Sequence, residues 1–249
     1  MLSSFATALA PHIDFPDTRA AILMLYRWIH LLAGVTWIGL LYFFNLVNVP
    51  LMKQLDATTK GKVVPPLMSR ALWWFRMSAV ITVLSGLLYF AYIVGNDARN
   101  AGQSQGPMMG SFFVIWTITW AILYAFLMPG KGVLNKGPVL AVLDAIVVIA
   151  AAWLFLSLNT HGWESHQALA IGIGGGLGWV MMLNVWGVIW RIQKRIIQWT
   201  KESAANGTPM PEQSGRMARM AFLASRTNAY LSIPLLFFMG AASHYPFLG

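Results

Sequence analysis

The chain has 249 residues, of which 57% are hydrophobic and only 10% are charged, whereas soluble domains carry about 25% charged residues. This composition excludes an ordinary soluble domain and predicts an integral membrane protein with one membrane domain over residues 1–249. The absence of cysteine excludes disulfides, thiolate catalysis, iron–sulfur clusters and a CxxCH site for covalent haem. The formal net charge of +9 fits either nucleic-acid binding or membrane topology, depending on where the basic residues lie.

Six apolar stretches predict an all-α bundle of about six transmembrane helices. Residues 1–16 lack the basic segment of a cleaved signal peptide, so we expect them in the mature chain, with Asp17 capping the first helix. We expect Pro50 to end that helix and a separate basic helix to start near Glu212. The spans are expected at about residues 20–49, 71–95, 111–128, 138–158, 167–190 and 228–244, with connections at 51–70, 96–110, 129–137, 159–166 and 202–211.

A histidine, His30, lies near the middle of the first apolar run. An ionisable side chain at that depth in a membrane is costly, so His30 is a candidate functional residue. Gly34 lies one turn further along on the same helix face and leaves room for a flat group such as haem. Alternatively, His30 hydrogen-bonds a neighbouring helix and Gly34 lets that helix approach closely. The residues alone leave both interpretations open.

The fifth span opens with a series of glycines that forms two GxxxG pairs, Gly172 with Gly176 and Gly174 with Gly178. Such pairs usually let helices pack closely, and a flat cofactor can use the same absence of side chains. We therefore keep Gly172 and Gly176 as candidate cofactor-binding residues at about the depth of His30. The series is not a phosphate-binding loop, because it lies within a span.

The connection at 159–166 contains two histidines and a carboxylate, as His161-Gly-Trp-Glu-Ser-His166. Zinc or copper ligands follow such a pattern, and so does a tight polar loop that caps the next helix. His166 is in addition a candidate axial ligand of haem. No Ser/His/Asp arrangement and no pair of close carboxylates indicates a catalytic site, so the catalytic residues are unknown at this stage.

Polar residues inside the spans need hydrogen-bond partners, because lipid offers none. Asp144 lies near one end of the fourth span and Asn184 lies towards the same side in the fifth. We interpret both as structural groups that bond neighbouring helices.

Lysine and arginine are distributed unevenly between the two sides that six spans define. With both termini on one side, only three of the 17 basic residues lie there and fourteen lie on the other. The positive-inside rule then places both termini outside, which is periplasmic in a bacterial inner membrane. The charge therefore predicts contact with membrane lipid and no nucleic-acid partner. All five histidines fall on the outer side, as expected of a redox or metal site at that face.

Three blocks together resemble the membrane-bound, cytochrome-c-linked urate oxidases (urate hydroxylases), with a weaker fourth at Gly178 and Asn184-Val185. The first block is Arg27-Trp-Ile-His30-Leu-Leu-Ala-Gly34-Val-Thr-Trp37-Ile-Gly39, and the second is Trp74-Phe75-Arg76 followed by Leu84-Ser85-Gly86. The third runs from Ser225-Arg226 through Asn228, Tyr230-Leu231, Pro234, Phe237 and Met239 to His244-Tyr245-Pro246. The resemblance covers most of the chain from Tyr26 to Pro246.

The resemblance implies a redox membrane domain that passes electrons from urate, or another small reduced substrate, to a cytochrome c. His30, Arg226, Asn228 and His244 are the residues carried over. Our leading hypothesis adds haem b near the outer face and a periplasmic cytochrome c, or a larger electron-transfer complex, as partner. Two positions depart from the family pattern, because Ser78 replaces an expected acid and Gly172 an expected histidine. The alternative is therefore a non-catalytic membrane subunit that scaffolds a respiratory or photosynthetic complex.

Within this hypothesis, His30 is the expected primary ligand of the haem iron. His244, at the end of the last span, is the expected second ligand or a partner of the haem, although straight helices would place it ~10 Å or more nearer the outer surface. We expect Arg226 to bond a helix end or a carboxylate such as Asp144, because a buried guanidinium must find acceptors.

Overall fold

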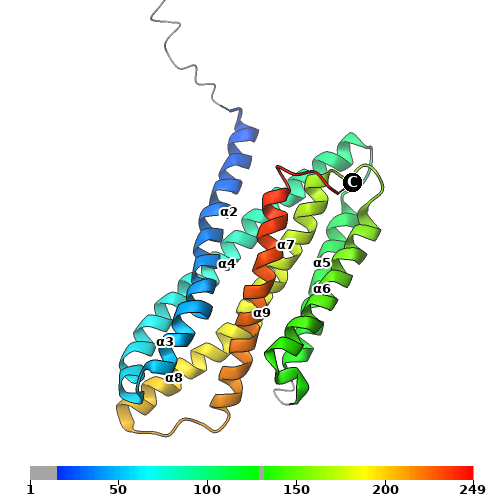
Figure 1. Ribbon diagram of the computed structural model, residues 1–249. Helices are drawn as coiled ribbons and strands as arrows, with labels where there is room; N and C mark the ends of the chain where they lie inside the picture. Colours follow the sequence, from blue (N-terminus) through cyan, green and yellow to red (C-terminus); the bar gives the residue numbers. More distant parts are fainter. Residues whose placement is uncertain (1–15, 129–131, 249) are drawn as a thin grey trace, which may run out of the picture.

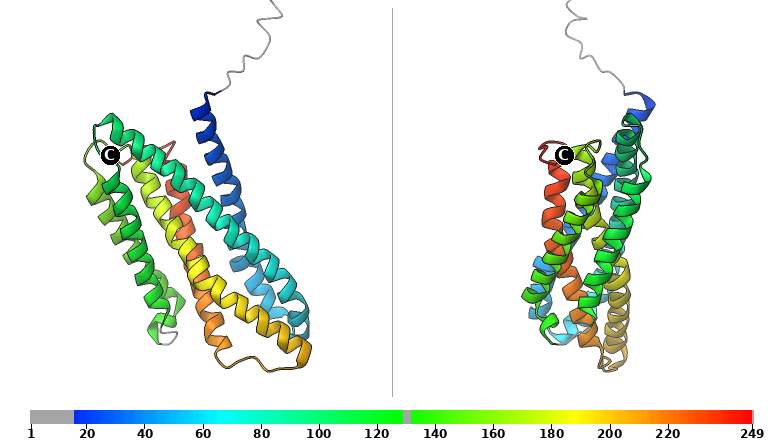
Figure 2. Two further views of the ribbon diagram at one scale, coloured as in Figure 1. Left: turned by 180° about the vertical axis from the view of Figure 1, so that it is seen from behind. Right: turned by 90° about the vertical axis from the view of Figure 1, so that its right-hand side faces the viewer.

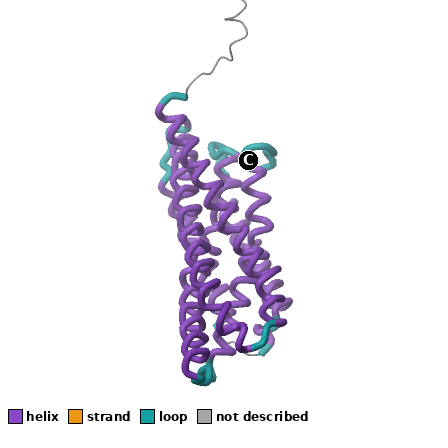
Figure 3. Tube along the Cα trace, turned by 90° about the vertical axis from the view of Figure 1, so that its left-hand side faces the viewer, coloured by secondary structure: helices purple, strands orange, loops and turns teal. Residues whose placement is uncertain are grey.

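The computed structural model describes residues 16–128 and 132–248. The expectations for residues 1–15 and for residues 129–131 therefore concern parts of the chain outside that description. Within it, every regular element is a helix, and six helical rods run through the molecule (Figure 1). Loops gather at the two ends of the bundle (Figure 3). The predicted all-α class is confirmed.

The rods differ in length, and two are interrupted by a π-helical turn. The first of these two begins with α2 (Thr18–Tyr42) and continues through η1 (Phe43–Asn48) into α3 (Val49–Gln54). The second begins with α7 (His166–Asn184) and continues through η3 (Val185–Ile189) into α8 (Trp190–Asn206). The others are α4 (Ala57–Asn100), α5 (Gly106–Leu127), α6 (Gly137–Asn159), preceded by the 3₁₀ turn η2 (Val133–Asn135), and α9 (Ser214–Ala241).

Five of these rods are long and apolar enough to cross a membrane, so the chain is a multi-pass membrane protein. The sixth, α9, does not reach the same apolarity, but its 28 residues are long enough and it packs along α7. Its first half is polar because it carries the basic segment that we expected to form a separate helix. That separation was wrong, since one continuous helix covers both parts.

The connection expected at 51–70 is mostly helical, which is a second correction. Pro50 does not end the first rod, because the chain passes without a break from α2 through the π-helical turn η1 into α3, and Pro50 lies just after that turn. After a short turn, Asp56 caps α4 by accepting a 3.0 Å hydrogen bond from the backbone N–H of Thr59. Helix α4 then runs for 44 residues to Asn100. At ~1.5 Å per residue it is far longer than a bilayer core, so it extends beyond the membrane.

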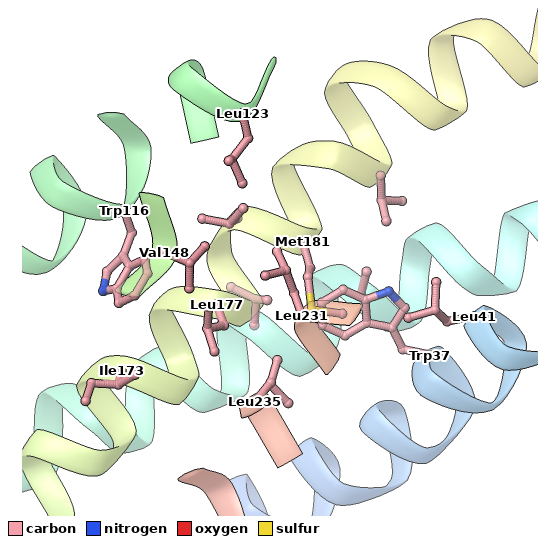
Figure 4. Packing of buried hydrophobic residues seen from close by; sticks show 14 of the residues in the cluster. Trp37, Leu41, Trp116, Leu123, Val148, Ile173, Leu177, Met181, Leu231 and Leu235 are labelled. Carbon is pink, nitrogen blue, oxygen red and sulfur yellow. The ribbon is translucent and has the colours of Figure 1, made fainter. Parts of the chain in front are cut away.

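The central element is α7, which is the most deeply buried of the five candidate spans. Its glycines let neighbours approach on two sides, as the GxxxG pattern predicts. A Cβ added at Gly176 would lie 1.9 Å from the Trp116 indole of α5, and one added at Gly174 would lie 2.5 Å from Met239 of α9. Around α7, Trp37 reaches from α2 towards Met181 and Leu231 in the core (Figure 4).

Four polar residues of α9 bond to four other parts of the bundle. Ser225 accepts a 2.9 Å hydrogen bond from Asn45 of η1, and Thr227 donates a 2.8 Å bond to Asp144 of α6. Asn228 accepts a 2.9 Å bond from Asn184 of α7, and Ser232 pairs with the Tyr42 hydroxyl of α2 at 2.9 Å. Helix packing therefore explains why polar residues recur in this stretch of α9.

The first residues of α2 and the C-terminal segment lie at the same end of the bundle (Figure 1), which we call the terminal end. The opposite end holds α3, the start of α4, and α8, whose axis runs beside α4 (Figure 2). The basic residues of α8 and of the first turns of α9 lie at this opposite end: Arg191, Lys194, Arg195, Lys201, Arg216 and Arg219.

Candidate functional site

His30 lies half-buried between α2 and α4, and its orientation is fixed by α4. Its Nδ1 is 2.8 Å from the backbone carbonyl oxygen of Thr82. A carbonyl oxygen only accepts hydrogen bonds, so Nδ1 carries the proton and Nε2 keeps its lone pair. The bond to a neighbouring helix is one of our two interpretations of His30. It is also the arrangement that metal-binding histidines use to fix their ring and tautomer.

Glycine at position 86 makes this geometry possible. A Cβ added there would lie 2.8 Å from both Nδ1 and Cε1 of His30, which is closer than real side chains approach. At Gly34, by contrast, an added Cβ would make an ordinary 3.7 Å contact with the Thr82 side chain. Gly86 belongs to the sequence block that resembles the urate oxidases, but nothing in the sequence pairs it with a histidine 56 positions earlier.

The His30 ring faces a cavity of about 450 Å³ that we call the glycine cavity. Helices α2, α4, α5, α7 and α9 line it, its walls are almost entirely apolar, and it is partly open beside the exposed side chains of Leu31 and Val35. Six of the lining residues are glycines, and the His30 ring and Met239 pack against two of them, Gly86 and Gly174. The six are Gly34, Gly39, Gly86, Gly174, Gly175 and Gly178.

A second cavity, of about 730 Å³, lies nearer the terminal end and is called the mouth cavity. It shares His30 and Met239 with the glycine cavity, so both residues lie where the two meet. Its walls are more polar and include Arg27, whose guanidinium lies 5.7 Å from the centre of the Tyr89 ring. A fixed cation at this position suits a carboxylate-bearing ligand.

Trp37 lines the glycine cavity and carries an unpaired donor in the core beside it. Its side chain is 1% exposed, and its indole Nε1 finds no acceptor among the residues that the structure describes. A buried N–H group without a partner costs free energy, so this one calls for an explanation.

The other two candidate ligand histidines line neither cavity. His244 is exposed in the turn after α9, where its Nδ1 donates a 3.0 Å hydrogen bond to the carbonyl of Gly240. His166 uses both ring nitrogens to hold the C-terminal segment: Nε2 donates to Ala241 at 3.2 Å, and Nδ1 accepts from Leu248 at 3.1 Å. Their roles as ligands stay predictions, and in this arrangement only His30 of the three faces a cavity.

Gly172 and Gly176 also lie away from both cavities. A Cβ added at Gly172 would lie 2.3 Å from the Phe155 ring of α6, and Gly176 is covered by Trp116. The Trp116 indole also donates a 3.1 Å hydrogen bond to the carbonyl of Gly172. These two glycines therefore accommodate aromatic rings from α5 and α6, whereas Gly174 and Gly178 of the other pair line the glycine cavity.

Three of the four candidate structural polar residues, Asn184, Asn228 and Asp144, belong to two separate hydrogen-bond networks. Asn184 and Asn228 are completely buried and bonded to each other, and the Trp120 indole donates a further 3.1 Å bond to Asn184. Asp144 bonds Thr227, not Arg226, while the Arg226 guanidinium lies 5.2 Å from the centre of the Phe222 ring. The suggestion that Arg226 bonds Asp144 was therefore wrong, since the next residue, Thr227, makes that bond.

The loop at 159–166 is a tight cap rather than an open ligand cluster. Glu164 accepts a 2.8 Å hydrogen bond from the backbone N–H of His161. It accepts a second bond of 2.8 Å from Nδ1 of the His161 ring. Burial alone would raise the pKa of Glu164, but the hydrogen bonds from His161 outweigh it and lower that pKa below its usual range. Ser165 caps α7 and bonds Asp97 at the end of α4 at 2.6 Å. No group of three potential metal ligands occurs among residues 16–128 and 132–248.

Comparison with known proteins gives one match. The family model described as urate oxidase N-terminal matches residues 56–249, while no curated protein and no solved structure matches the chain. The matched part contains α4 to α9, including the residues of the Asn184–Asn228 network, and α2 with His30 precedes it. Since the match covers well over half of the sequence, the chain belongs to the urate oxidase N-terminal family.

Proposed function

We propose that this chain is a membrane redox protein that binds haem b beside His30 and passes electrons to a cytochrome c at the outer face. The single observation that carries the proposal is the His30–Thr82 hydrogen bond of 2.8 Å, which leaves the Nε2 lone pair free at the boundary of two cavities. A neutral imidazole with a fixed ring is the commonest protein ligand of haem iron.

The surroundings of His30 fit a haem in two further respects. The glycine cavity has almost entirely apolar walls and several glycines among its lining residues, which suits the face of a macrocycle. Arg27 of the mouth cavity would pair with the propionates, because a guanidinium is the preferred partner of carboxylates. The bound haem would supply one-electron redox chemistry, and this chain would orient it, exclude water from it and set its potential.

Met239 would help His30 to hold the haem. It lines both cavities together with His30, and its thioether is a known haem ligand that raises the reduction potential. His244 lies at the exposed turn after α9 and would have to move to reach the same cavity. A partner role at the surface, towards the cytochrome c, suits His244 better.

A non-catalytic scaffold is the second candidate, and the two positions that depart from the family pattern favour it. The Ser78 hydroxyl donates a 2.6 Å hydrogen bond to the carbonyl of Trp74 in its own helix. At position 172, Phe155 fills the space that a side chain would need. The structure therefore has no room for a histidine side chain at position 172. Such a chain could keep the fold and lack urate oxidation.

A visible spectrum of the purified full-length protein separates the two candidates. The redox proposal expects a reduced-minus-oxidised α band of the b type, and expects the reduced protein to reduce a soluble ferricytochrome c in stopped-flow mixing. A spectrum without haem bands from protein expressed with sufficient haem would contradict the proposal and favour the scaffold. A haem spectrum without electron transfer would contradict the assignment of cytochrome c as acceptor.

The bacterial inner membrane with periplasmic termini is the location that this proposal requires. Its support is the basic end of the bundle, which lies opposite the terminal end and would face the cytoplasm. The glycine and mouth cavities then lie in the outer half, where a periplasmic cytochrome c has access.

A further inference from the structure

One arginine of α4, Arg76, lies within the apolar run expected at 71–95 and lines neither cavity of the redox site proposed above. Among residues 16–128 and 132–248, the only charged pair joins His161 to Glu164 in the loop at 159–166, so no carboxylate balances the charge of Arg76. A guanidinium stays charged at every physiological pH, and a charge within a membrane span is costly unless it is paired.

Two tryptophans of the neighbouring rod hold the guanidinium of Arg76. Its central carbon lies 3.8 Å from the centre of the Trp190 ring and 5.5 Å from the centre of the Trp186 ring. The Trp186 indole also donates a 3.3 Å hydrogen bond to the backbone carbonyl of Arg76, which ties η3 to α4. Stacking on aromatic rings uses the face of a guanidinium and leaves the N–H groups in its plane available.

The protein does not use those N–H groups. No acceptor among the described residues pairs with the Arg76 guanidinium. The residue is partly exposed, and Nε is the one nitrogen of the group that is both buried and unpaired, so the two terminal nitrogens reach the surface of the bundle. A guanidinium with free terminal N–H groups binds a phosphate or a carboxylate through two parallel hydrogen bonds.

A second cation, Lys194, flanks the same aromatic ring. It lies four residues after Trp190 in α8, so it is one turn further along on the same helix face. Its side chain is exposed and pairs with no carboxylate of the described residues. Helices α4 and α8 run side by side in opposite directions, because Gly61 meets Ala204 while Arg76 meets Trp190. Arg76 and Lys194 therefore lie on either side of Trp190.

The neighbouring residues place this pair at the level of the lipid headgroups. Trp73 and Trp74 lie up to a turn before Arg76 in α4 and are 45% and 59% exposed. Exposed tryptophans of membrane proteins gather at the boundary between hydrocarbon and headgroups. Since α4 enters the membrane from the basic end, Arg76 lies on the hydrocarbon side of both tryptophans. A lipid phosphate can reach it there more readily than a carboxylate of a soluble partner.

We propose that the surface between α4 and α8, at Arg76 and Lys194, binds the phosphate of an anionic phospholipid. The free N–H groups of Arg76 would hold the phosphate oxygens, and Lys194 would add a second positive charge. A zwitterionic lipid offers the same phosphate, but its ammonium group is repelled by Lys194 and by Arg191, which is also exposed. The charge of the headgroup therefore decides which lipid occupies the site.

The test measures lipid binding to the full-length protein in neutral detergent by native mass spectrometry. Phosphatidylglycerol and phosphatidylcholine with identical chains are the two probes. We expect phosphatidylglycerol to bind about tenfold or more tightly, the effect of one hydrogen-bonded ion pair. Inorganic phosphate should not displace it, because the site is reached from the bilayer. Displacement by phosphate at a similar concentration would reassign the site to a free anion and overturn the proposal.

Three variants separate a defined site from diffuse attraction to the basic end. Arg76→Met keeps an unbranched side chain over Trp190 and should abolish the preference for phosphatidylglycerol. Lys194→Met changes an exposed side chain, so it tests the site even if Arg76→Met does not fold, and it should lower the preference about two- to fivefold.

Lys62→Met is the matched control, because Lys62 is exposed on α4 at the same end, about 21 Å of helix rise from Arg76, and its loss should leave the preference unchanged. Equal affinity for the two lipids would overturn the proposal. An equal loss of preference in Lys62→Met and in the two site variants would also overturn it, since diffuse charge then explains the binding. None of these readouts depends on haem.

Discussion

The buried amide pair Asn184–Asn228 allows a quantitative prediction about what holds α7 and α9 together. Asn228 accepts a 2.9 Å hydrogen bond from Asn184 and donates a 3.0 Å bond to the carbonyl of Met181. Hydrogen bonds between membrane helices contribute about 0.6 kcal/mol on average and up to about 1.7 kcal/mol each. Asn228→Ala removes both bonds, so we expect a loss of about 1–3 kcal/mol in the free energy of unfolding.

A double-mutant cycle isolates the pair from the cavity that each truncation leaves. We expect Asn184→Ala and Asn228→Ala to couple by about 0.6–1.7 kcal/mol, measured by reversible unfolding in mixed micelles with tryptophan fluorescence as the signal. Ser157→Ala is the matched control, because Ser157 is exposed and bonds only its own helix, so it should change stability by less than about 0.5 kcal/mol. A coupling near zero would refute the view that this pair ties α7 to α9.

Three further outcomes are expected. Gly86→Ala should push the His30 ring off the Thr82 carbonyl, destabilise the protein by about 1–3 kcal/mol and lower its haem content, whereas Gly110→Ala, with nothing within 4 Å of its added Cβ, should do neither. Because the pKa of Glu164 is lowered in the folded protein, the ionised carboxylate stabilises the fold fully above the ordinary carboxyl pKa. This contribution is lost as the pH falls through the lower pKa of the folded state. The melting temperatures of the wild type and Glu164→Gln should therefore differ most above about pH 4.5 and converge in stronger acid. In whole cells, an impermeant thiol reagent should label His161→Cys, whose side chain is 60% exposed, and spare Lys53→Cys; the reverse pattern contradicts the orientation.

Hydropathy predicted most of the fold, because the need to bury backbone polar groups in lipid leaves few alternatives to long helices. The helix ends were less predictable, since local capping decides them. Asp56 starts α4 well before the apolar run, and Pro50 follows the π-helical turn η1 within a continuous rod. The central position of α7 was only hinted at by its glycines, because a GxxxG pair does not say which helix it meets.

The sequence predicted the part of the candidate site in which a polar residue interrupts an apolar run. His30 stood out as a histidine in an apolar run, and the structure places it at a cavity wall. Its partner was beyond prediction, because a backbone carbonyl 52 residues away carries no signature in the sequence. For the same reason, the sequence suggested Arg226 as the partner of Asp144, where the neighbouring Thr227 faces it instead.

The haem content of the His30→Ala variant tests the central proposal most directly. Haem is extracted and quantified per protein for the wild type, His30→Ala and His161→Ala, the last being an exposed loop histidine that serves as control. Our account predicts that the wild type and His161→Ala carry the same haem complement with a b-type α band, and that His30→Ala loses it. A His30→Ala protein that keeps the full wild-type haem complement and spectrum would contradict the account.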